Sequence, residues 1–370
     1  MRKPFDTTLF LATVLLVGLG MTMVFSSSAI FAREKFGQNS YFLKKEIFYV
    51  LIGFVGLFVA RKIPFDWYRR GIYPLFIISL GLLLVVFIPS IGLKAGGAHR
   101  WINLFFFSFQ PSELAKLVLV IYLAYALSKK QEKIRSFLIG FVPPMILSGA
   151  MIAPILFQKD LGNALLMTAT VFTLFFVAGA RLSYLVTEVF LAIPAFILMI
   201  ASVNYRRQRI LAFLNPWEHR ETSGFQLIQS LVAFQTGGFW GQGLGGGKQK
   251  LFYLPEAHTD FIFSVVAEEL GFLGVLGMLI LFGVFLYRSF VIAWRAPDFF
   301  STYLASGIAI LFGLQVLLNI GVVIGLLPTK GLTLPFISYG GSSLIISLIA
   351  VGILLNISSQ GQDNDHRRKN

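Results

Sequence analysis

The sequence is dominated by apolar segments that are each about as long as a membrane is thick. A spanning helix needs about 20 mostly apolar residues. Ten segments meet this requirement, at approximately 8–30, 46–61, 71–90, 112–128, 136–157, 161–179, 183–203, 261–287, 302–327 and 341–358. The sequence therefore predicts an all-α, polytopic membrane protein of about ten transmembrane helices, in a single domain over residues 1–370. An even number of spans puts both termini on the same side of the membrane.

The composition agrees with a chain that lies in lipid and excludes several other classes. Hydrophobic residues make up 56% of the 370 residues and charged residues only 13%, against about 25% charged in a soluble globular domain. The chain has no cysteine, which excludes disulfides, thiolate nucleophiles and cysteine-bound metals. The first apolar run, from Leu9 to about Ile30, is longer than the roughly 7–15 residues of a signal-peptide core. We interpret it as a retained membrane helix.

Basic residues set the expected orientation and indicate an anionic ligand. The formal net charge is +14. The density of Lys and Arg is higher in the loops on the side of the two termini, which predicts that both termini are cytoplasmic. The opposite, periplasmic side carries one long loop, about 204–260. The polar cytoplasmic tail, about 360–370, is predicted to be disordered. Cations in the outer loops run against the positive-inside trend, so we expect an anionic ligand there, and no nucleic acid.

A charged pair opens the fourth apolar segment. In the sequence FQPSELAK, Glu113 and Lys116 are three residues apart and so lie on one helix face. One interpretation is a pair that neutralises itself in lipid. The other is that the pair, together with Ser112, lines a polar cavity and orients a phosphate or a hydroxyl. Upstream, Arg100 offers a bidentate donor for phosphate, and Trp101 is either an aromatic platform or part of the interfacial belt.

Two further polar stretches have competing interpretations. Asp160, in the sequence QKDLG, caps the following helix, pairs with a cation such as Lys116, or contacts the substrate. The segment GQGLGGGKQK has the spacing G-x-G-x-x-G, but no strand precedes it and the P-loop pattern fails, which argues against nucleotide binding. We expect either a flexible basic loop that presents Lys248 and Lys250 to the substrate, or a loop that is merely solvated.

The segment 327–343 interrupts an apolar pattern with two prolines around Lys330. Irregular backbone survives at membrane depth only where it lines protein or a wet cavity. We therefore predict a re-entrant element that forms the floor of the same cavity, with Ser338 and Tyr339 as candidate substrate contacts. The paired glycines and serines that follow allow close helix approach.

The stretch HTDF carries the acid that we expect to perform the chemistry. Acidic side chains at a membrane boundary are costly unless they are paired, solvated or used. Asp260 lies where an apolar segment begins, beside His258 and Thr259. The simpler interpretation is a first-turn charge or a helix cap. The alternative is a general base that removes a proton from a sugar hydroxyl while nearby cations assist the departure of a pyrophosphate.

These motifs together resemble the SEDS family (shape, elongation, division and sporulation) over nearly the whole chain. The resemblance rests on RWINL at Arg100, FQPSELAK at Phe109, NPW at Asn215, FQLIQSL at Phe225, GQGLG at Gly241, QKLFYLPEAHTDFIF at Gln249, EELG at Glu268 and LPTKGLTLPFISYGGSS at Leu327. The sequence PTKGLTLP is typical of the division members. One departure is Lys159, where members usually have proline.

The resemblance implies a ten-helix protein that polymerises lipid II into glycan strands beside a class B penicillin-binding protein. It also implies that Asp260 is the essential acid and that Glu113 and Lys116 act in a central cavity. We therefore expect a peptidoglycan glycosyltransferase of the inner membrane that serves septal wall synthesis, with other division membrane proteins as partners. A growing strand on undecaprenyl pyrophosphate would be the donor, and the 4-hydroxyl of an incoming lipid II the acceptor.

Several cations are expected to steady the pyrophosphate: Arg100, Lys116, Lys248, Lys250 and Lys330. A divalent cation, Mg²⁺ or Mn²⁺, would share that role without a dedicated protein cage, and no organic cofactor is expected. Two other functions stay open. A charged cavity between membrane helices also suits a flippase for lipid II, and a division scaffold would recruit the synthase without any catalysis of its own.

Overall fold

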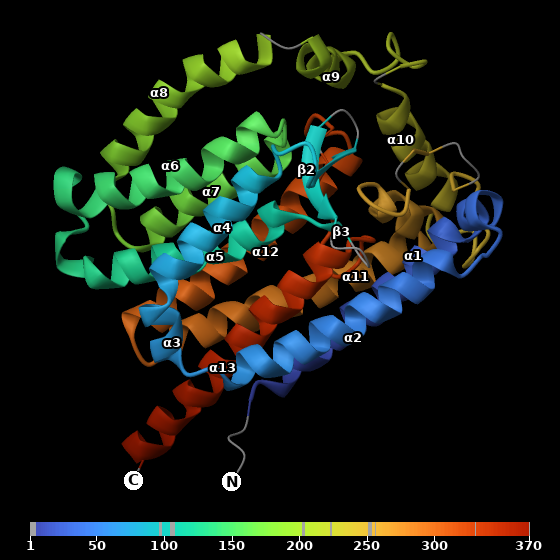
Figure 1. Cartoon of the computed structure of the whole chain (residues 1–370). Coiled ribbons are helices and arrows are strands. Elements are labelled where there is room, and N and C mark those ends of the chain that lie inside the picture. The colour runs from blue at the N-terminus through green and yellow to red at the C-terminus, as the bar shows by residue number, and fades with distance from the viewer. Residues whose placement is uncertain are drawn as a thin grey trace.

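The computed structural model is a bundle of long helices with one small sheet at one end (Figure 1). It describes residues 5–95, 98–103, 108–201, 204–222, 224–250, 254–255, 257–329 and 331–369. The helices are α1 (Thr7–Phe36), α2 (Tyr41–Lys62), α3 (Phe65–Arg70), α4 (Ile72–Val85), α5 (Pro111–Lys129), α6 (Val142–Phe157), α7 (Leu161–Val177), α8 (Leu182–Ala201), α9 (Asn204–Leu214), α10 (Phe225–Gly237), α11 (Ile262–Trp294), α12 (Phe299–Val323) and α13 (Gly341–Lys369).

The ten predicted spans each fall on one of these helices, which confirms the all-α, polytopic fold. Six helical segments in the described chain are long and apolar enough to cross a membrane: α1, α5, Phe137–Phe157, α11, α12 and Gly341–Gln360. Three shorter apolar helices, Ile72–Val85, Leu161–Val177 and Leu182–Pro194, account for three more of the expected spans. Phe137–Phe157 joins a π-helical turn, Phe137–Phe141, to α6.

The two ends of the bundle carry different elements. Both ends of the chain lie at one end of the bundle, whereas the sheet, α9 and α10 lie at the other (Figure 1). Along the bundle, α13 packs on α2, and α12 packs against α5, α7 and α11. In the apolar stretches of α5 and α12, 83% and 72% of the residues are buried inside the protein, against 28% in α11. Polar side chains on α5 and α12 are therefore held at the centre of the molecule.

A three-stranded antiparallel sheet covers the start of α5, and the sequence analysis did not predict it. Its strands are β1 (Gly92–Ala95), β2 (Ala98–Asn103) and β3 (Ser108–Phe109), in the order β1-β2-β3. Ile102 of β2 is opposite Gly92 on one side and Phe109 on the other. Strands of two to six residues are too short for an alternating pattern to be recognised in sequence. The sheet carries two of the predicted site residues, Arg100 and Trp101, on β2.

Two helices, α13 and α11, differ from what the sequence predicts for them. Helix α13 continues to Lys369, so the polar tail assigned to a disordered segment is a helical extension up to that residue. Helix α11 is broken at Gly271, whose φ of +64° and ψ of −165° are not helical. This left-handed conformation favours glycine because a Cβ would be strained there. By contrast, the described residues 331–340 contain no helix and are mostly buried, as the predicted re-entrant element requires.

Candidate active site

Asp260 lies in the turn that leads into α11, at the end of the bundle opposite the termini. The residue at the N-cap of α11 is Phe261, which provides no side-chain cap, so the N-cap role does not account for this acid. The Asp260 side chain is half-buried. Asp260 is therefore not the N-cap residue of α11, whereas a first-turn charge and a general base both fit its position.

The irregular segment after α12 packs directly on this turn. The backbone N–H of Tyr339 donates to the carbonyl of His258 at 2.9 Å, and the Ser338 hydroxyl donates to the carbonyl of Thr259 at 2.6 Å. At Gly331, an added Cβ would lie 3.2 Å from Oδ2 of Asp260. The acid thus has bare backbone beside it. The irregular segment, called the floor below, therefore packs on the turn that carries Asp260, and substrate contact by Ser338 and Tyr339 stays a prediction.

The ring of His258 is held by aromatic side chains. Its centroid is 4.9 Å from that of Phe42, 5.8 Å from that of Phe31 and 5.9 Å from that of Tyr339. These partners come from α1, α2 and the irregular segment, which are far apart in the sequence. His258 is thus a packed ring beside the acid, which suits a role in holding the turn.

The predicted pair on α5 is formed. The Nζ of Lys116 lies 2.9 Å from Oε2 of Glu113, and the two side chains are only 4% and 7% exposed. Lys116 also donates to Oε1 of Gln315 at 3.4 Å, and Nε2 of Gln315 donates to the carbonyl of Thr333 at 2.9 Å. The self-neutralising pair and the cavity role are therefore compatible, because Gln315 links Lys116 to the carbonyl of Thr333.

Asp160 caps α7, which is one of the roles the sequence left open. Its Oδ1 accepts from the backbone N–H of Asn163 at 3.2 Å and its Oδ2 from Nδ2 of the same residue at 2.9 Å. The predicted ion pair between Asp160 and Lys116 is wrong, because the Lys116 ammonium pairs with Glu113. Ser112 is buried and lies 3.5 Å from the Nδ2 of Asn163.

Arg100 holds the loop before Asp160. Its guanidinium donates to the carbonyl of Lys159 at 2.6 Å and to that of Gln158 at 3.3 Å. The backbone of Lys159 is left-handed, with a φ of +59°. Two donors of Arg100 are thus committed to backbone, and the side chain of Trp101 is half-buried beside it on β2.

The Gly-rich loop is anchored to the broken part of α11. The N–H groups of Gln242 and Gly243 donate to the carbonyls of Glu268 and Glu269, each at 2.9 Å. These carbonyls precede the break at Gly271, so the loop satisfies backbone groups that the broken helix leaves unpaired. The expectation of a flexible loop is wrong for this part of it.

Two buried carboxylates hold the rest of that loop. Glu268 accepts from the N–H of Lys248 at 2.8 Å. Glu269, with its side chain fully buried, is 2.6 Å from the Nζ of Lys250. The proposed contact of Lys250 with a pyrophosphate is therefore corrected, since its ammonium is buried in an ion pair. The side chain of Lys248 remains exposed.

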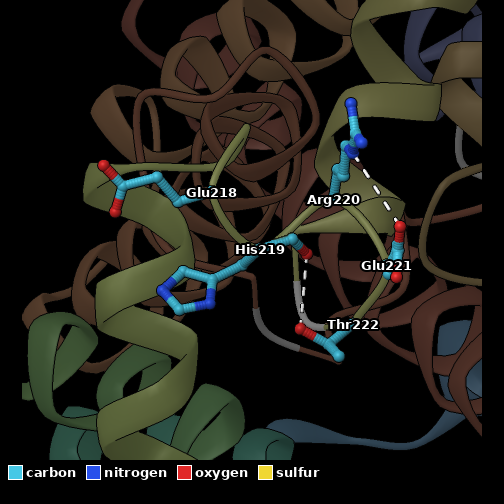
Figure 2. A pocket seen from close by; sticks show the side chains of 5 residues that line it. All are labelled: Glu218, His219, Arg220, Glu221 and Thr222. Carbon is cyan, nitrogen blue, oxygen red and sulfur yellow. Dashed lines mark hydrogen bonds and ion pairs between the residues drawn. The ribbon is translucent and has the colours of Figure 1, made fainter.

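One predicted site residue and one surface hollow remain to be described. Lys330 lies outside the described residues. A hollow on the loop between α9 and α10 contains none of the predicted site residues (Figure 2); it is lined by Glu218, His219, Arg220, Glu221 and Thr222. Its one ion pair, at 4.0 Å, joins side chains that are 72% and 86% exposed. A surface hollow of this kind lacks the buried, convergent groups of a catalytic site.

The described residues do not form a cage for the divalent cation that was expected. Nowhere in the described chain do three His, Asp or Glu side chains gather so that they could hold a metal ion. The donor set near Asp260 consists instead of one carboxylate, amides and hydroxyls. We derive no step of the reaction through a metal.

The sequence analysis missed two buried carboxamides on α12, of which Asn319 contacts the backbone of Asp260. Gln315 and Asn319 lie four residues apart on α12 and contact the floor of the site. A signal was present, because polar residues at i and i+4 within an otherwise apolar span lie on one helix face. Ser26 of α1 was also missed; its hydroxyl donates to Glu269.

Comparison with known proteins places the chain in one family. The family of FtsW, RodA and SpoVE, described as "Cell cycle protein", matches residues 7–363. A probable peptidoglycan glycosyltransferase FtsW of Geobacter sp. (strain M18) is 49% identical over 356 residues, which cover 96% of this chain and 97% of that one. Stage V sporulation protein E of Bacillus subtilis is 44% identical over 353 residues, covering 95% and 96%.

Two solved structures have the same fold as this chain. A chain from a structure described as "Structural coordination of polymerization and crosslinking by a peptidoglycan synthase complex" superposes with a TM-score of 0.80 at 32% identity, covering 96% of this chain and 98% of that chain. The Rod shape determining protein RodA of Thermus thermophilus gives a TM-score of 0.72 at 30% identity, covering 96% and 97%. The chain therefore belongs to the family of cell cycle proteins that includes FtsW, RodA and SpoVE, the shape, elongation, division and sporulation proteins.

Proposed function

We infer that the chain is a peptidoglycan glycosyltransferase. Relatives at 49–50% identity over 96% of the chain carry this name. The observation that supports a catalytic role is the position of Asp260, half-buried and packed against the backbone of Gly331. A carboxylate with bare backbone beside it can be approached by a hydroxyl, as a general base must be.

The proposed step is a displacement at the anomeric carbon of the donor strand. Asp260 removes the proton of the acceptor 4-hydroxyl, and the oxygen forms a bond to that carbon. The bond from the anomeric carbon to the undecaprenyl pyrophosphate breaks, and the pyrophosphate leaves with the electron pair. The proton then passes from Asp260 to solvent. General-base assistance of this kind typically contributes about 10²–10⁴ in rate.

The cations divide into two groups in this proposal. Lys248, which is exposed, and Arg100, which is half-buried, are the candidates to contact the pyrophosphate, because charge develops there as the bond breaks. Lys116 is buried and paired with Glu113. It therefore acts by holding the floor, and Lys250 acts by holding the loop.

The setting in the cell is part of the proposal. The chain is a multi-pass membrane protein, and both its termini lie at one end of the bundle (Figure 1). His258, two residues before Asp260, packs on Phe31 near the C-terminal end of α1, which is the end of that helix away from the N-terminus. We propose that the termini face the cytoplasm and that Asp260 faces the outer side, where Lys and Arg are less dense. A synthase complex that couples polymerization and crosslinking contains a similar chain. This supports a penicillin-binding protein as partner. We propose that the partner is of class B and that the pair serves septal synthesis.

Purified protein supplied with lipid II in detergent micelles tests this function. The polymerase makes glycan strands in micelles, which have no second compartment, when the penicillin-binding partner is added. A flippase makes no polymer there and moves lipid II only across a sealed bilayer. A scaffold does neither. Failure to form strands in the presence of the folded partner complex would contradict the proposed function.

A further inference from the structure

Two carboxamides lie at the centre of the bundle, and no step of the proposed reaction uses them. Gln315 and Asn319 are only 3% and 2% exposed, and their spacing puts them on one face of α12. Burying an amide is costly unless its polar atoms find partners. Their partners therefore indicate what these side chains do.

Asn319 joins the turn that carries the acid to the floor of the site. Its Nδ2 donates to the carbonyl of Asp260 at 3.0 Å and to the carbonyl of Leu332 at 2.6 Å. Its Oδ1 is buried and accepts no hydrogen bond from the described residues. A single amide group thus fixes the backbone of the acid relative to the segment that begins at Gly331.

Gln315 joins the same segment to the charged pair of α5. Its Nε2 donates to the carbonyl of Thr333 at 2.9 Å, and its Oε1 accepts from the Nζ of Lys116 at 3.4 Å. The floor residues Leu332 and Thr333 are therefore held by two amides that are one helical turn apart. A continuous set of contacts runs from Glu113 through Lys116 and the floor to Asp260.

We propose that Gln315 and Asn319 are positioning residues for the glycosyl transfer. They hold the floor between Lys116 and Asp260, and so fix where the Asp260 carboxylate meets the acceptor hydroxyl. Neither amide touches the reacting atoms in this proposal. The inference rests on the proposed function, because it assigns these residues a role through the general base.

The geometry indicates the size of the effect. Oδ2 of Asp260 lies so close to Gly331 that an added Cβ would be 3.2 Å away. A shift of the floor therefore changes the surroundings of the carboxylate directly. Misplacing a catalytic group by about 1 Å can cost about 10² in rate. The loss should appear in kcat, because neither amide binds the substrate.

Asn356 of α13 offers a matched control. It is 5% exposed, and its Nδ2 donates to the carbonyls of Ala60, in α2, and Ile63, the C-cap of that helix, at 3.4 and 2.6 Å. Ala60 lies 18 residues, or about 27 Å along the helix, from Phe42, which contacts His258. Asn356→Leu thus removes the same kind of contact far from the site.

The experiment compares Asn319→Leu with Asn356→Leu in lipid II polymerisation by the purified complex, with thermal stability measured alongside. We expect similar losses of stability, but a fall in kcat of about 10² for Asn319→Leu only, with KM for lipid II little changed. Equal kcat values for the two variants would overturn the proposal. So would an effect of Asn319→Leu on KM alone.

A second variant keeps the proposal falsifiable if Asn319→Leu does not fold. Gln315→Met keeps the side-chain length and removes both contacts, and it should also lower kcat without changing KM. If neither variant folds, the amides are structural and the proposal is wrong. Asp260→Asn is measured in parallel. An active Asp260→Asn would refute the general base itself, whereas an inactive one beside a normal Asn319→Leu would refute only the positioning role.

Discussion

The buried pair on α5 gives a prediction whose size follows from the structure. Glu113 and Lys116 are 2.9 Å apart, with side chains 7% and 4% exposed, so neither charge can turn to water if its partner is removed. Breaking a buried pair typically costs about 3–5 kcal/mol, whereas replacing both partners by packed residues is often nearly neutral. The change to make is Glu113→Gln, Lys116→Met and the double substitution.

The two single changes should not be equal. Lys116→Met leaves the Glu113 carboxylate buried and unpaired, so we expect the full loss of about 3–5 kcal/mol. In Glu113→Gln the amide oxygen can still accept from Lys116, which also keeps its contact with Gln315. We expect about 1–3 kcal/mol there. The double substitution should cost about as much as the milder single change. The coupling energy then equals the cost of Lys116→Met alone, about 3–5 kcal/mol.

Equilibrium unfolding in mixed dodecylmaltoside and SDS micelles measures these free energies, and polymerisation rates are measured on the same variants. The pair Arg69–Asp298 is a control, because its side chains are 36% and 44% exposed and surface pairs contribute about 0–1 kcal/mol. Strict additivity of Glu113→Gln and Lys116→Met, within about 0.5 kcal/mol, would show that the two residues do not interact.

Two other predictions rest on contacts and a third on the orientation of the chain in the membrane. Gly331→Ala should lower the polymerisation rate about tenfold or more, because the added Cβ displaces the general base. Gly277→Ala should not lower it, because a Cβ there meets nothing within 4 Å. Equal rates for the two variants would refute the contact between Gly331 and Asp260. Lys250→Met should destabilise the protein by about 3–5 kcal/mol because it leaves Glu269 unpaired, while a stable variant would show that the ion pair does not form. In the Cys-free parent, Lys248→Cys, at an exposed position, should react with an impermeant thiol reagent on intact cells and Lys130→Cys only after lysis; the reverse pattern would contradict the orientation.

The ten spans could be predicted from the sequence because each is set by a local property, the length of an apolar run. The Glu113–Lys116 pair was predictable for the same reason, since i and i+3 residues share a helix face. The position of Asp260 beside the segment 331–340 followed from the chemistry of the two motifs. The structure adds the contacts that join them, the hydrogen bonds from Tyr339 and Ser338 to the carbonyls of His258 and Thr259.

What the sequence could not give depends on long-range partners. Lys250 and Glu269 are both visible as charges, but only the fold brings the loop onto the break in α11 at Gly271. The pairing changes Lys250 from a substrate contact into a structural cation. The sheet that carries Arg100 was missed because its strands are too short for a pattern. By contrast, Gln315 and Asn319 could have been found from polar spacing alone.

The central claim is that Asp260 is the general base. Asp260→Asn keeps the size of the side chain and its ability to accept hydrogen bonds, but an amide cannot take the proton. Asp298→Asn is the matched control, because that acid caps α12 about 30 Å along the helix from Asn319. The measurement is glycan-strand formation from lipid II by each purified complex, with thermal stability checked alongside.

We expect Asp298→Asn to polymerise at close to the parental rate and Asp260→Asn, equally stable, to lose about 10²–10⁴ in rate. If Asp260→Asn retains more than about a tenth of the parental rate, the general-base role is wrong, and the cluster around Glu113 becomes the next candidate.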